Sequence, residues 1–316
     1  MLALGFVILS VIGGLFLAMT LIWLTSIAIS NPTIVDVWWS SGMALSMAIY
    51  LLASSQQLWS IVLSGMFLFW ALRLTLFILI TRICKSHTDE RYAKMESNWK
   101  NQQGDQNQQG EPNMMPIYRK RFLAFQFQTF MQLLLLIPLI VSTYDIEQPE
   151  NDKNSLNAGA IVFAVLQVLS VLGQWVTDYQ VYAFAQKQIA IRKENPNAPR
   201  LICKTGLWSY SRHPNYFFEM TIWISFVGYI YSIIIPLFDD NYNLEGNKAL
   251  AVSQLIVPVL PVIIMFVIFR YITGPITEGA SLKKRPVLYK EYIENVPMIF
   301  PFIKWPNFVS NMEVLV

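Results

Sequence analysis

Seven stretches of the chain are long and apolar enough to form membrane-spanning helices. Polar segments separate them, and each stretch is close to or above the roughly 20 residues that an α-helix needs to cross the hydrocarbon core of a bilayer. The expected helices cover residues 3–30, 37–55, 58–82, 122–144, 157–184, 213–237 and 249–272. The pattern predicts an all-α, polytopic membrane protein with about seven transmembrane helices.

Prolines mark two of the expected helix ends. Asn31 and Pro32 close the first helix, because proline and the residue before it both leave the helical region. Pro214 suits the first turn of the sixth helix, where its missing N–H costs nothing and its fixed φ is already helical. The sixth helix is therefore expected to begin near His213 and to carry Glu219 into the membrane.

The composition agrees with a membrane location. The chain has 316 residues, 54% of them hydrophobic and 14% charged, with a mean hydropathy of +0.42. The N-terminal apolar stretch is longer than a signal-peptide core and lacks a basic start, so we expect it to be retained as a helix. No tandem repeat is visible in the sequence, so residues 1–316 are interpreted as one membrane domain. Both the endoplasmic reticulum and the mitochondrial inner membrane are compatible with this pattern.

The distribution of basic residues predicts an orientation. Segment 82–121 contains eight Lys and Arg, segment 187–212 six and the tail after residue 273 five, whereas 145–156 and 238–248 contain one each. By the positive-inside rule the three basic segments share one side, and the N-terminus lies on the opposite side. The positive-inside rule accounts for the basic charge of these loops, and no nucleic-acid-binding module is recognisable. We therefore expect no nucleic-acid partner.

One part of the first basic segment is unusual in composition. From Asn101 to Gln109 it consists almost wholly of Asn, Gln and Gly. Such a tract cannot bury enough apolar surface to fix its conformation. Residues 96–113 are therefore interpreted as a disordered loop without catalytic residues.

Several charged residues lie within or at the edge of the expected helices. A charge in hydrocarbon is costly unless it is paired, so Asp36 and Arg73 are expected to face a partner or a wet cavity. For Arg73, extension of the side chain to the near interface is the alternative. Asp178, Asn215 and Glu219 are expected to have side-chain partners inside the protein.

Residues 206–219 gather the candidates for a binding site. Free backbone amides at the start of the sixth helix, together with Arg212 and His213, suit an anion at the aqueous edge. Asn215 and Glu219 are four residues apart and share a helix face. This arrangement suits the phosphates and sugar of a nucleotide held at a bilayer surface.

The sequence excludes several common kinds of site. It contains neither GxGxxG nor GxxxxGK[ST], so a nucleotide would lie among the helices. Cys84 and Cys203 have neither CxxC spacing nor a neighbouring His/Cys cluster. We therefore expect no metal site and no disulfide framework.

The segment from Gly206 to Glu219 also resembles a family signature. It is similar to the pattern GLW-x-Y-[ST]-RHPNY-F-x-E of uncharacterised membrane proteins (DUF1295-type) grouped with the steroid 5-alpha-reductase C-terminal family. Further similarities are a D-x-x-W element at Asp36, W-x-x-R-L at Trp70, Asp89-Glu90-Arg91-Tyr92, D-x-Q-x-x-x-F from Asp178 and E-x-x-x-L…Y-x-x-Y from Glu278. The tail is similar to that of isoprenylcysteine carboxyl methyltransferases as well, and sterol reductases are more distantly similar.

The resemblance implies a membrane reductase that uses NADPH to reduce a conjugated double bond in a lipid-like or steroid-like substrate. It implies a variable substrate half at 1–145 and a cofactor-binding half at 157–301. The cofactor-binding residues implied are Asp178, Arg212, His213, Asn215, Tyr216, Glu219, Glu278, Tyr289 and Tyr292. The candidates for the substrate side and for catalysis are Asp36, Arg73 and Tyr92.

Two other functions stay open. Methyl transfer from S-adenosylmethionine is one, because the methyltransferases share the RHPxY element and the tail; chain length and the N-terminal elements favour the reductase. A catalytically silent subunit of a larger membrane assembly is the other. Phe218 stands where the family usually has glycine, Ala185 where a basic residue is usual, and Gln174-Trp175 replace a smaller, acidic pair. A phenyl ring at 218 could fill space that a cofactor needs.

Overall fold

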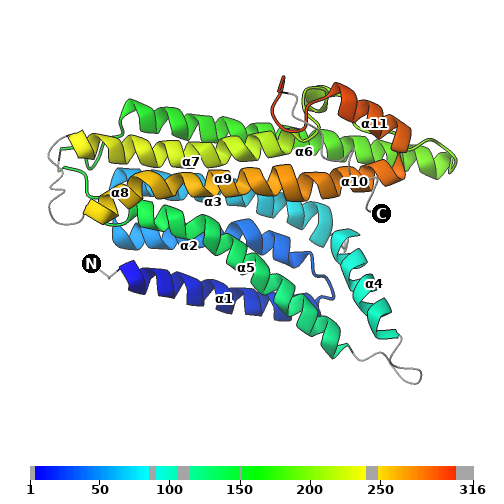
Figure 1. Ribbon diagram of the computed structural model, residues 1–316, viewed down its shortest axis with the longest axis horizontal. Helices are drawn as coiled ribbons and strands as arrows, with labels where there is room; N and C mark the ends of the chain where they lie inside the picture. The colour runs from blue at the N-terminus through cyan, green and yellow to red at the C-terminus, as the bar shows by residue number, and fades with distance from the viewer. Residues whose placement is uncertain (1–3, 85–89, 105–113, 150, 240–247, 304–316) are drawn as a thin grey trace. The chain divides into compact units, whose positions relative to one another are not determined.

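The fold is known from a computed structural model that describes residues 4–84, 90–104, 114–149, 151–239 and 248–303 (Figure 1). All regular secondary structure in these ranges is helical, which confirms the all-α prediction. The elements are α1 (Leu4–Ala28), α2 (Ile34–Ser54), α3 (Leu58–Ile78), π-helical η1 (Leu79–Ile83), α4 (Glu90–Gly104), α5 (Met115–Thr143), α6 (Ala158–Glu194), 3₁₀-helical η2 (Gly206–Ser209), α7 (Pro214–Asp239), α8 (Lys248–Ile256), 3₁₀-helical η3 (Val257–Val259), α9 (Leu260–Val267), π-helical η4 (Ile268–Thr273), α10 (Gly274–Lys284) and α11 (Pro286–Asn295).

Within the described residues, seven helical runs are long and apolar enough to cross a membrane, and this confirms the predicted number. The first three and the sixth agree with the expected ranges to within a few residues, and α7 begins at Pro214 as expected. Helix α5 begins earlier than predicted, at Met115 rather than residue 122. The protein is thus an all-helical, multi-pass membrane protein.

Two predicted helix ends are wrong. Helix α6 continues to Glu194 instead of ending at residue 184, because good helix formers follow without Gly or Pro until Asn195-Pro196. The last span continues to Lys284 instead of ending at residue 272. Pro275 is tolerated there because it lies in the first turn of α10, directly after η4. Glu278 therefore sits in a spanning helix rather than in a tail.

The chain divides into two compact units. Unit 1 comprises residues 1–160 and 230–258, and unit 2 comprises residues 161–229 and 259–316. The proposed division of labour between residues 1–145 and 157–301 stays a prediction. Each unit is described separately below.

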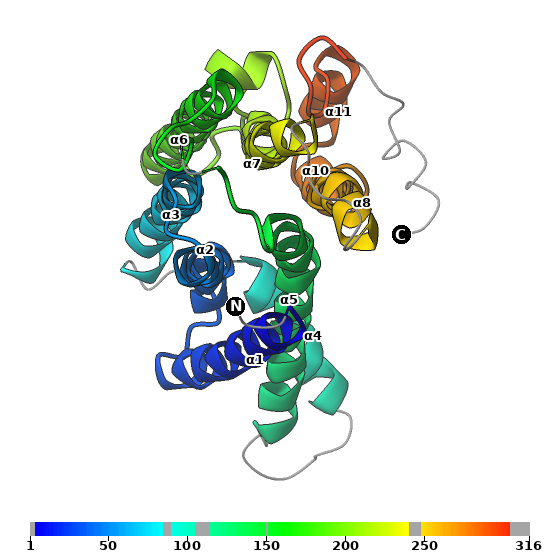
Figure 2. The same ribbon diagram turned by 90° about the vertical axis from the view of Figure 1, so that its left-hand side faces the viewer.

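In unit 1, α2 is the central helix, since it packs against α1, α3 and α5 (Figure 2). Met43 and Met47 of α2 are buried, as are Trp59, Leu63, Phe67 and Trp70 of α3. On each helix these side chains recur every three or four residues and so form an apolar stripe. Many other apolar side chains of α1, α2 and α3 are exposed, as expected for a surface that faces lipid.

In unit 2, α6 and α7 pack through two glycines. A Cβ atom at Gly173 would overlap the ring of Phe218, and one at Gly228 would overlap the ring of Phe163. The Gly173–Phe218 contact brings the first turns of α7 against α6, and the Gly228–Phe163 contact does so for the second half of α7. At the same end of unit 2, α10 contacts both η4 and α11. The start of α7, η4, α10 and α11 together surround the candidate site.

The expected disorder over residues 96–113 is wrong for its first part, because residues up to Gly104 belong to α4. Two contacts within unit 1 hold this helix: the Tyr92 hydroxyl donates to Asp36, and Glu96 pairs with Arg121 of α5. The prediction used only the local amide-rich composition, which cannot reveal partners as distant in sequence as Asp36 and Arg121. Residues 105–113 lie outside the described residues.

The predicted orientation can be tested by cysteine labelling. Cys84 is exposed after the third span, and Ser155 is exposed after the fourth. In sealed vesicles of one orientation, a membrane-impermeant maleimide is expected to label Cys84 and an introduced Ser155→Cys from opposite faces. Cys203 is buried, so the maleimide should not label it from either face. Labelling of both positions from the same face would contradict the topology.

Candidate functional site

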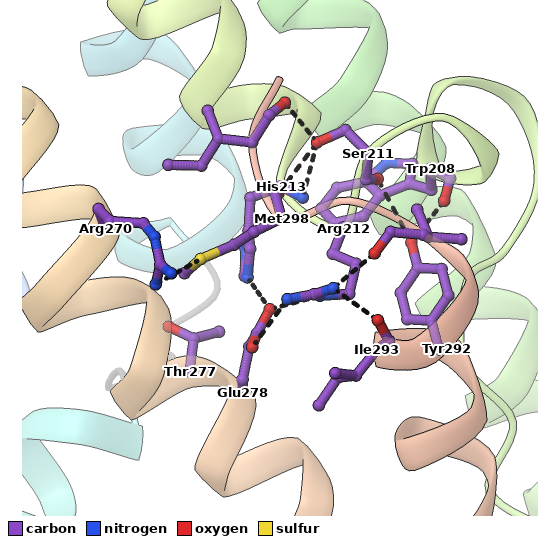
Figure 3. Close-up of polar contacts among 12 residues, drawn as sticks. Trp208, Ser211, Arg212, His213, Arg270, Thr277, Glu278, Tyr292, Ile293 and Met298 are labelled. Atoms are coloured by element: carbon purple, nitrogen blue, oxygen red, sulfur yellow. Dashed lines mark hydrogen bonds and ion pairs between the residues drawn. The ribbon is translucent and has the colours of Figure 1, made fainter. Parts of the chain in front are cut away.

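Arg212, just before α7, is the centre of a buried polar cluster in unit 2 (Figure 3). Its Nε donates to Glu278 Oε1 at 2.7 Å and its Nη2 to Glu278 Oε2 at 3.3 Å. Its Nη1 donates to the carbonyls of Ile293 at 3.1 Å and Val296 at 2.5 Å. The two charged side chains are only 2% and 1% exposed. A forked ion pair with further hydrogen bonds compensates charges that burial would otherwise leave unsolvated.

The neighbours of Arg212 bind the chain after α11. The backbone N–H groups of Arg212 and His213 each donate to a carbonyl of segment 297–299 at 2.9 Å. The Ser211 hydroxyl lies 2.8 Å from another carbonyl of that segment. The polar motif is thus attached by backbone and side chain to a segment more than eighty residues later in the sequence.

Tyr292 of α11 joins the same cluster. Its hydroxyl donates to the carbonyl of Trp208 and lies 3.4 Å from that of Ser211. Burial raises the pKa of Tyr292, and it raises that of Tyr289 as well. Both tyrosines therefore stay protonated near neutral pH, and the Tyr292 hydroxyl remains a donor.

The His213 ring links Glu278 to a row of aromatic rings. Its Nε2 lies 3.2 Å from Glu278 Oε1. The imidazole stacks on Tyr216 with centroids 4.7 Å apart, and Tyr216 stacks on Phe269 of η4 at 4.4 Å. Stacking on one face of the ring and a carboxylate at its Nε2 edge fix the orientation of the imidazole.

Glu219 is one turn further along α7. Its Oε2 accepts from Gln174 Nε2 at 2.7 Å, and its Oε1 accepts from Trp223 Nε1 at 3.0 Å. The prediction that Glu219 has partners inside the protein is confirmed. Asp178 lies half-buried on α6. Asn215 differs from the prediction, because its buried Oδ1 meets no hydrogen-bond donor among the described residues.

Unit 1 contains a polar cluster of its own at the start of α2. Asp36 Oδ1 accepts from the Tyr92 hydroxyl at 2.7 Å, and Asp36 Oδ2 accepts from Arg82 Nη1 at 3.3 Å. Gln128 Nε2 lies 3.4 Å from the Tyr92 oxygen. Arg82 belongs to η1, a π-helical turn of a kind common at functional sites. The structure therefore brings together Asp36 and Tyr92, two of the predicted catalytic residues.

Arg73, the third predicted catalytic residue, is buried on α3. Its guanidinium carbon lies 5.9 Å from the centroid of the Phe77 ring. Extension to the interface would have left the side chain exposed, so its burial favours the interior position.

Sequence analysis did not predict the contacts of three buried polar side chains, Arg121, Arg270 and Gln174. Arg121 on α5 pairs with Glu96 and donates to the Ser26 carbonyl at 3.3 Å. Arg270 in η4 lies 3.7 Å from the Met298 sulfur. A charge between Phe269 and Tyr271 is a signal that could have identified Arg270. The role of Gln174 could not be found in this way, because its partner lies on another helix.

This geometry defines a multi-pass α-helical membrane protein whose two units each contain an Arg–carboxylate cluster. Residues 22–296 match the family described as "Protein of unknown function (DUF1295)", and the chain belongs to that family. No curated protein and no solved structure matches the chain. The DUF1295 part of the resemblance is confirmed, and its reductase part is taken up as a proposal.

The stability of unit 2 is expected to depend on Arg212 even when no cofactor is present. Arg212→Gln leaves Glu278 buried without its main partner, so the free energy of unfolding should fall by about 3 to 5 kcal/mol. Denaturant titration in mixed micelles measures this change.

The matched control is Glu291→Gln in the same unit. Glu291 and Lys204 form an ion pair at 3.5 Å, and their side chains are 60% and 36% exposed. Its loss should cost no more than about 1 kcal/mol. If the two variants were equally stable, Arg212 would not have the structural role assigned to it.

Proposed function

We propose that the protein is a membrane reductase that uses NADPH to reduce a conjugated carbon–carbon double bond in a lipid-like substrate. The observation that carries the proposal is the Tyr92–Asp36 pair in unit 1. The buried Tyr92 hydroxyl donates a hydrogen bond to Asp36, which lies in the first turn of the spanning helix α2. Membership of a family of unknown function supplies no activity. The proposal therefore depends on the chemistry of this pair and on the polar cluster of unit 2.

In this proposal Tyr92 is the proton donor. Reduction of a polarised double bond requires a hydride at one carbon and a proton for the other end of the conjugated system. Bound NADPH supplies the hydride. The Tyr92 hydrogen bond moves from Asp36 to the substrate oxygen as the proton transfers, and the Gln128 amide stabilises the resulting tyrosinate.

Asp36 and Arg82 restore the proton. Asp36 takes a proton from water and passes it to the tyrosinate, with which it shares a 2.7 Å hydrogen bond. Arg82 balances the carboxylate charge, so that the negative charge that develops on the substrate is not repelled. The side chains of Arg82 and Asp36 are 30% and 16% exposed, which keeps the pair within reach of water.

Unit 2 offers an acceptor for the carboxamide of a nicotinamide ring. The buried Oδ1 of Asn215 has no donor in the described part of the chain, and a primary amide N–H is the kind of donor that satisfies it. Arg212 suits a phosphate less well than expected, because four of its hydrogen bonds already go to Glu278 and backbone carbonyls. In the proposal Arg212 positions the start of α7, and Asn215 binds the cofactor.

Arg200 and Arg285 are the candidates for the additional phosphate that distinguishes NADPH from NADH. Arg285 Nη1 donates to the Leu201 carbonyl at 2.7 Å, which places Arg285 beside residues 200 and 201. Burial, and then the like charge of Arg200, lower the pKa of Arg285. Two guanidinium groups held near each other are stabilised by an anion such as a phosphate.

The proton-donor role predicts a separation between binding and turnover. Tyr92→Phe should lower the rate of NADPH oxidation with an enone-bearing lipid by at least about 100-fold, because general acid catalysis contributes that much or more. The dissociation constant for NADPH should stay unchanged. Tyr118→Phe, on α5 of the same unit, is the control and should retain full activity. A Tyr92→Phe protein with normal turnover would rule out Tyr92 as the donor.

Cofactor preference is expected to depend on Arg200. Wild-type protein should bind NADPH more tightly than NADH, because only NADPH carries the additional phosphate. Arg200→Gln should weaken NADPH binding by about tenfold, close to the value of one charge-assisted hydrogen bond, and leave NADH binding unaltered. Fluorescence titration measures both constants, with Lys290→Gln on α11 as the control for surface charge. Equal losses for both nucleotides would contradict the assignment.

The silent-subunit alternative retains one supporting observation. The Phe218 ring packs directly on Gly173 and fills space between α6 and α7. If neither wild-type protein nor Phe218→Gly binds any nicotinamide nucleotide, the reductase proposal fails and this alternative replaces it. Saturable binding of S-adenosylmethionine would favour the methyltransferase instead.

A further inference from the structure

A cavity of about 500 Å³ lies in unit 1, far from Asp36 and Tyr92. This volume is within the range of small-molecule sites. Its walls come from the first turns of α1, the last turns of α2 and the end of α5 with the loop after it, the end of unit 1 that faces the viewer in Figure 2. Tyr50 lines it, and Tyr50 lies about 21 Å along the α2 axis from Asp36 at 1.5 Å per residue. The cavity is therefore separate from the proposed catalytic pair.

The cavity has an apolar interior and an acidic rim. Phe6 and Val11 of α1 and Ile49 of α2 line its wall. Asp145 and Glu147 line it where the chain leaves α5. Both carboxylates are exposed, and neither forms a hydrogen bond or ion pair with another described residue. Two negative charges at the mouth of an apolar cavity favour a ligand with an alkyl chain and a positive end.

The loop that carries these carboxylates is held by other parts of unit 1. The Tyr144 carbonyl accepts from Gln254 Nε2 at 2.7 Å, and the Gln148 N–H donates to Gln57 Oε1 at 3.0 Å. Between these anchors Asp145 adopts a φ of 61°, a left-handed conformation that is unfavourable for a non-glycine residue. Strained residues of this kind cluster at ligand-binding sites. The rim is thus a fixed feature of the fold.

We propose that this cavity binds a membrane amphiphile with an alkyl chain and a cationic amine headgroup. The chain occupies the apolar interior, and the ammonium group lies between Asp145 and Glu147. An anionic headgroup is repelled there, and a neutral one leaves both carboxylates without a counter-charge. The site is additional to the proposed reductase activity, because neither Asp36 nor Tyr92 takes part in it.

Three ligands with one alkyl chain and different headgroups test the proposal. Full-length protein in phosphatidylcholine nanodiscs is titrated with tritiated octadecylamine, octadecanol or octadecanoate. Octadecylamine should bind saturably with one site per chain and about tenfold more tightly than octadecanol, with octadecanoate weakest. The double variant Asp145→Asn, Glu147→Gln should abolish the preference for the amine.

Two adjacent glycines of α1 provide a matched pair of variants. Gly14 lines the cavity and Gly13 does not, and a Cβ atom at either position meets no atom within 4 Å. Gly14→Leu fills the cavity and should weaken octadecylamine binding by at least about tenfold, whereas Gly13→Leu should bind like wild type. Non-saturable uptake, equal or tighter binding of octadecanol or octadecanoate, or wild-type binding by Gly14→Leu would each overturn the proposal.

Discussion

The ion pair between Arg212 and Glu278 is the interaction on which the arrangement of unit 2 depends. It joins the start of α7 to α10, and the same guanidinium reaches two carbonyls at the end of α11. Such a pair is stable in a low-dielectric interior only when nearly every donor and acceptor is satisfied, which is the case here. Among the described residues, the two side chains are only 2% and 1% exposed, so water hardly reaches the pair. The role of Arg212 is therefore structural: it holds the start of α7, α10 and the end of α11 together.

Unit 1 uses the same chemical groups in a different setting. Asp36 also pairs with an arginine, but that pair is 30% and 16% exposed, against 2% and 1% in unit 2. A partly exposed carboxylate can exchange protons with water, whereas a fully enclosed one cannot do so without breaking its contacts. The difference in burial, rather than in residue type, separates a cluster suited to proton transfer from one suited to support.

Sequence analysis predicted the helices well because hydropathy is a local property, and it predicted the start of α7 because proline restricts its own backbone. It failed for α4, which is held by Asp36 and Arg121 from distant parts of the chain. Sequence analysis placed Arg212 and Glu278 in one site but assigned Arg212 to a phosphate. Arg212 instead donates to backbone carbonyls of residues 293 and 296. Because every residue has a backbone carbonyl, the sequence cannot indicate which ones will accept from an arginine.

The departures from the family pattern form contacts that explain one another. Gln174 is one of the two donors to Glu219, and Phe218 packs against the glycine that precedes Gln174. A buried carboxylate costs free energy to maintain, and an apolar side chain of similar size often packs there without loss of stability. Both donors to Glu219 belong to unit 2, so the cost of burying this carboxylate is offset within the unit. Glu219, Gln174 and Trp223 are therefore coupled, because removing either donor would leave part of a buried carboxylate without a partner.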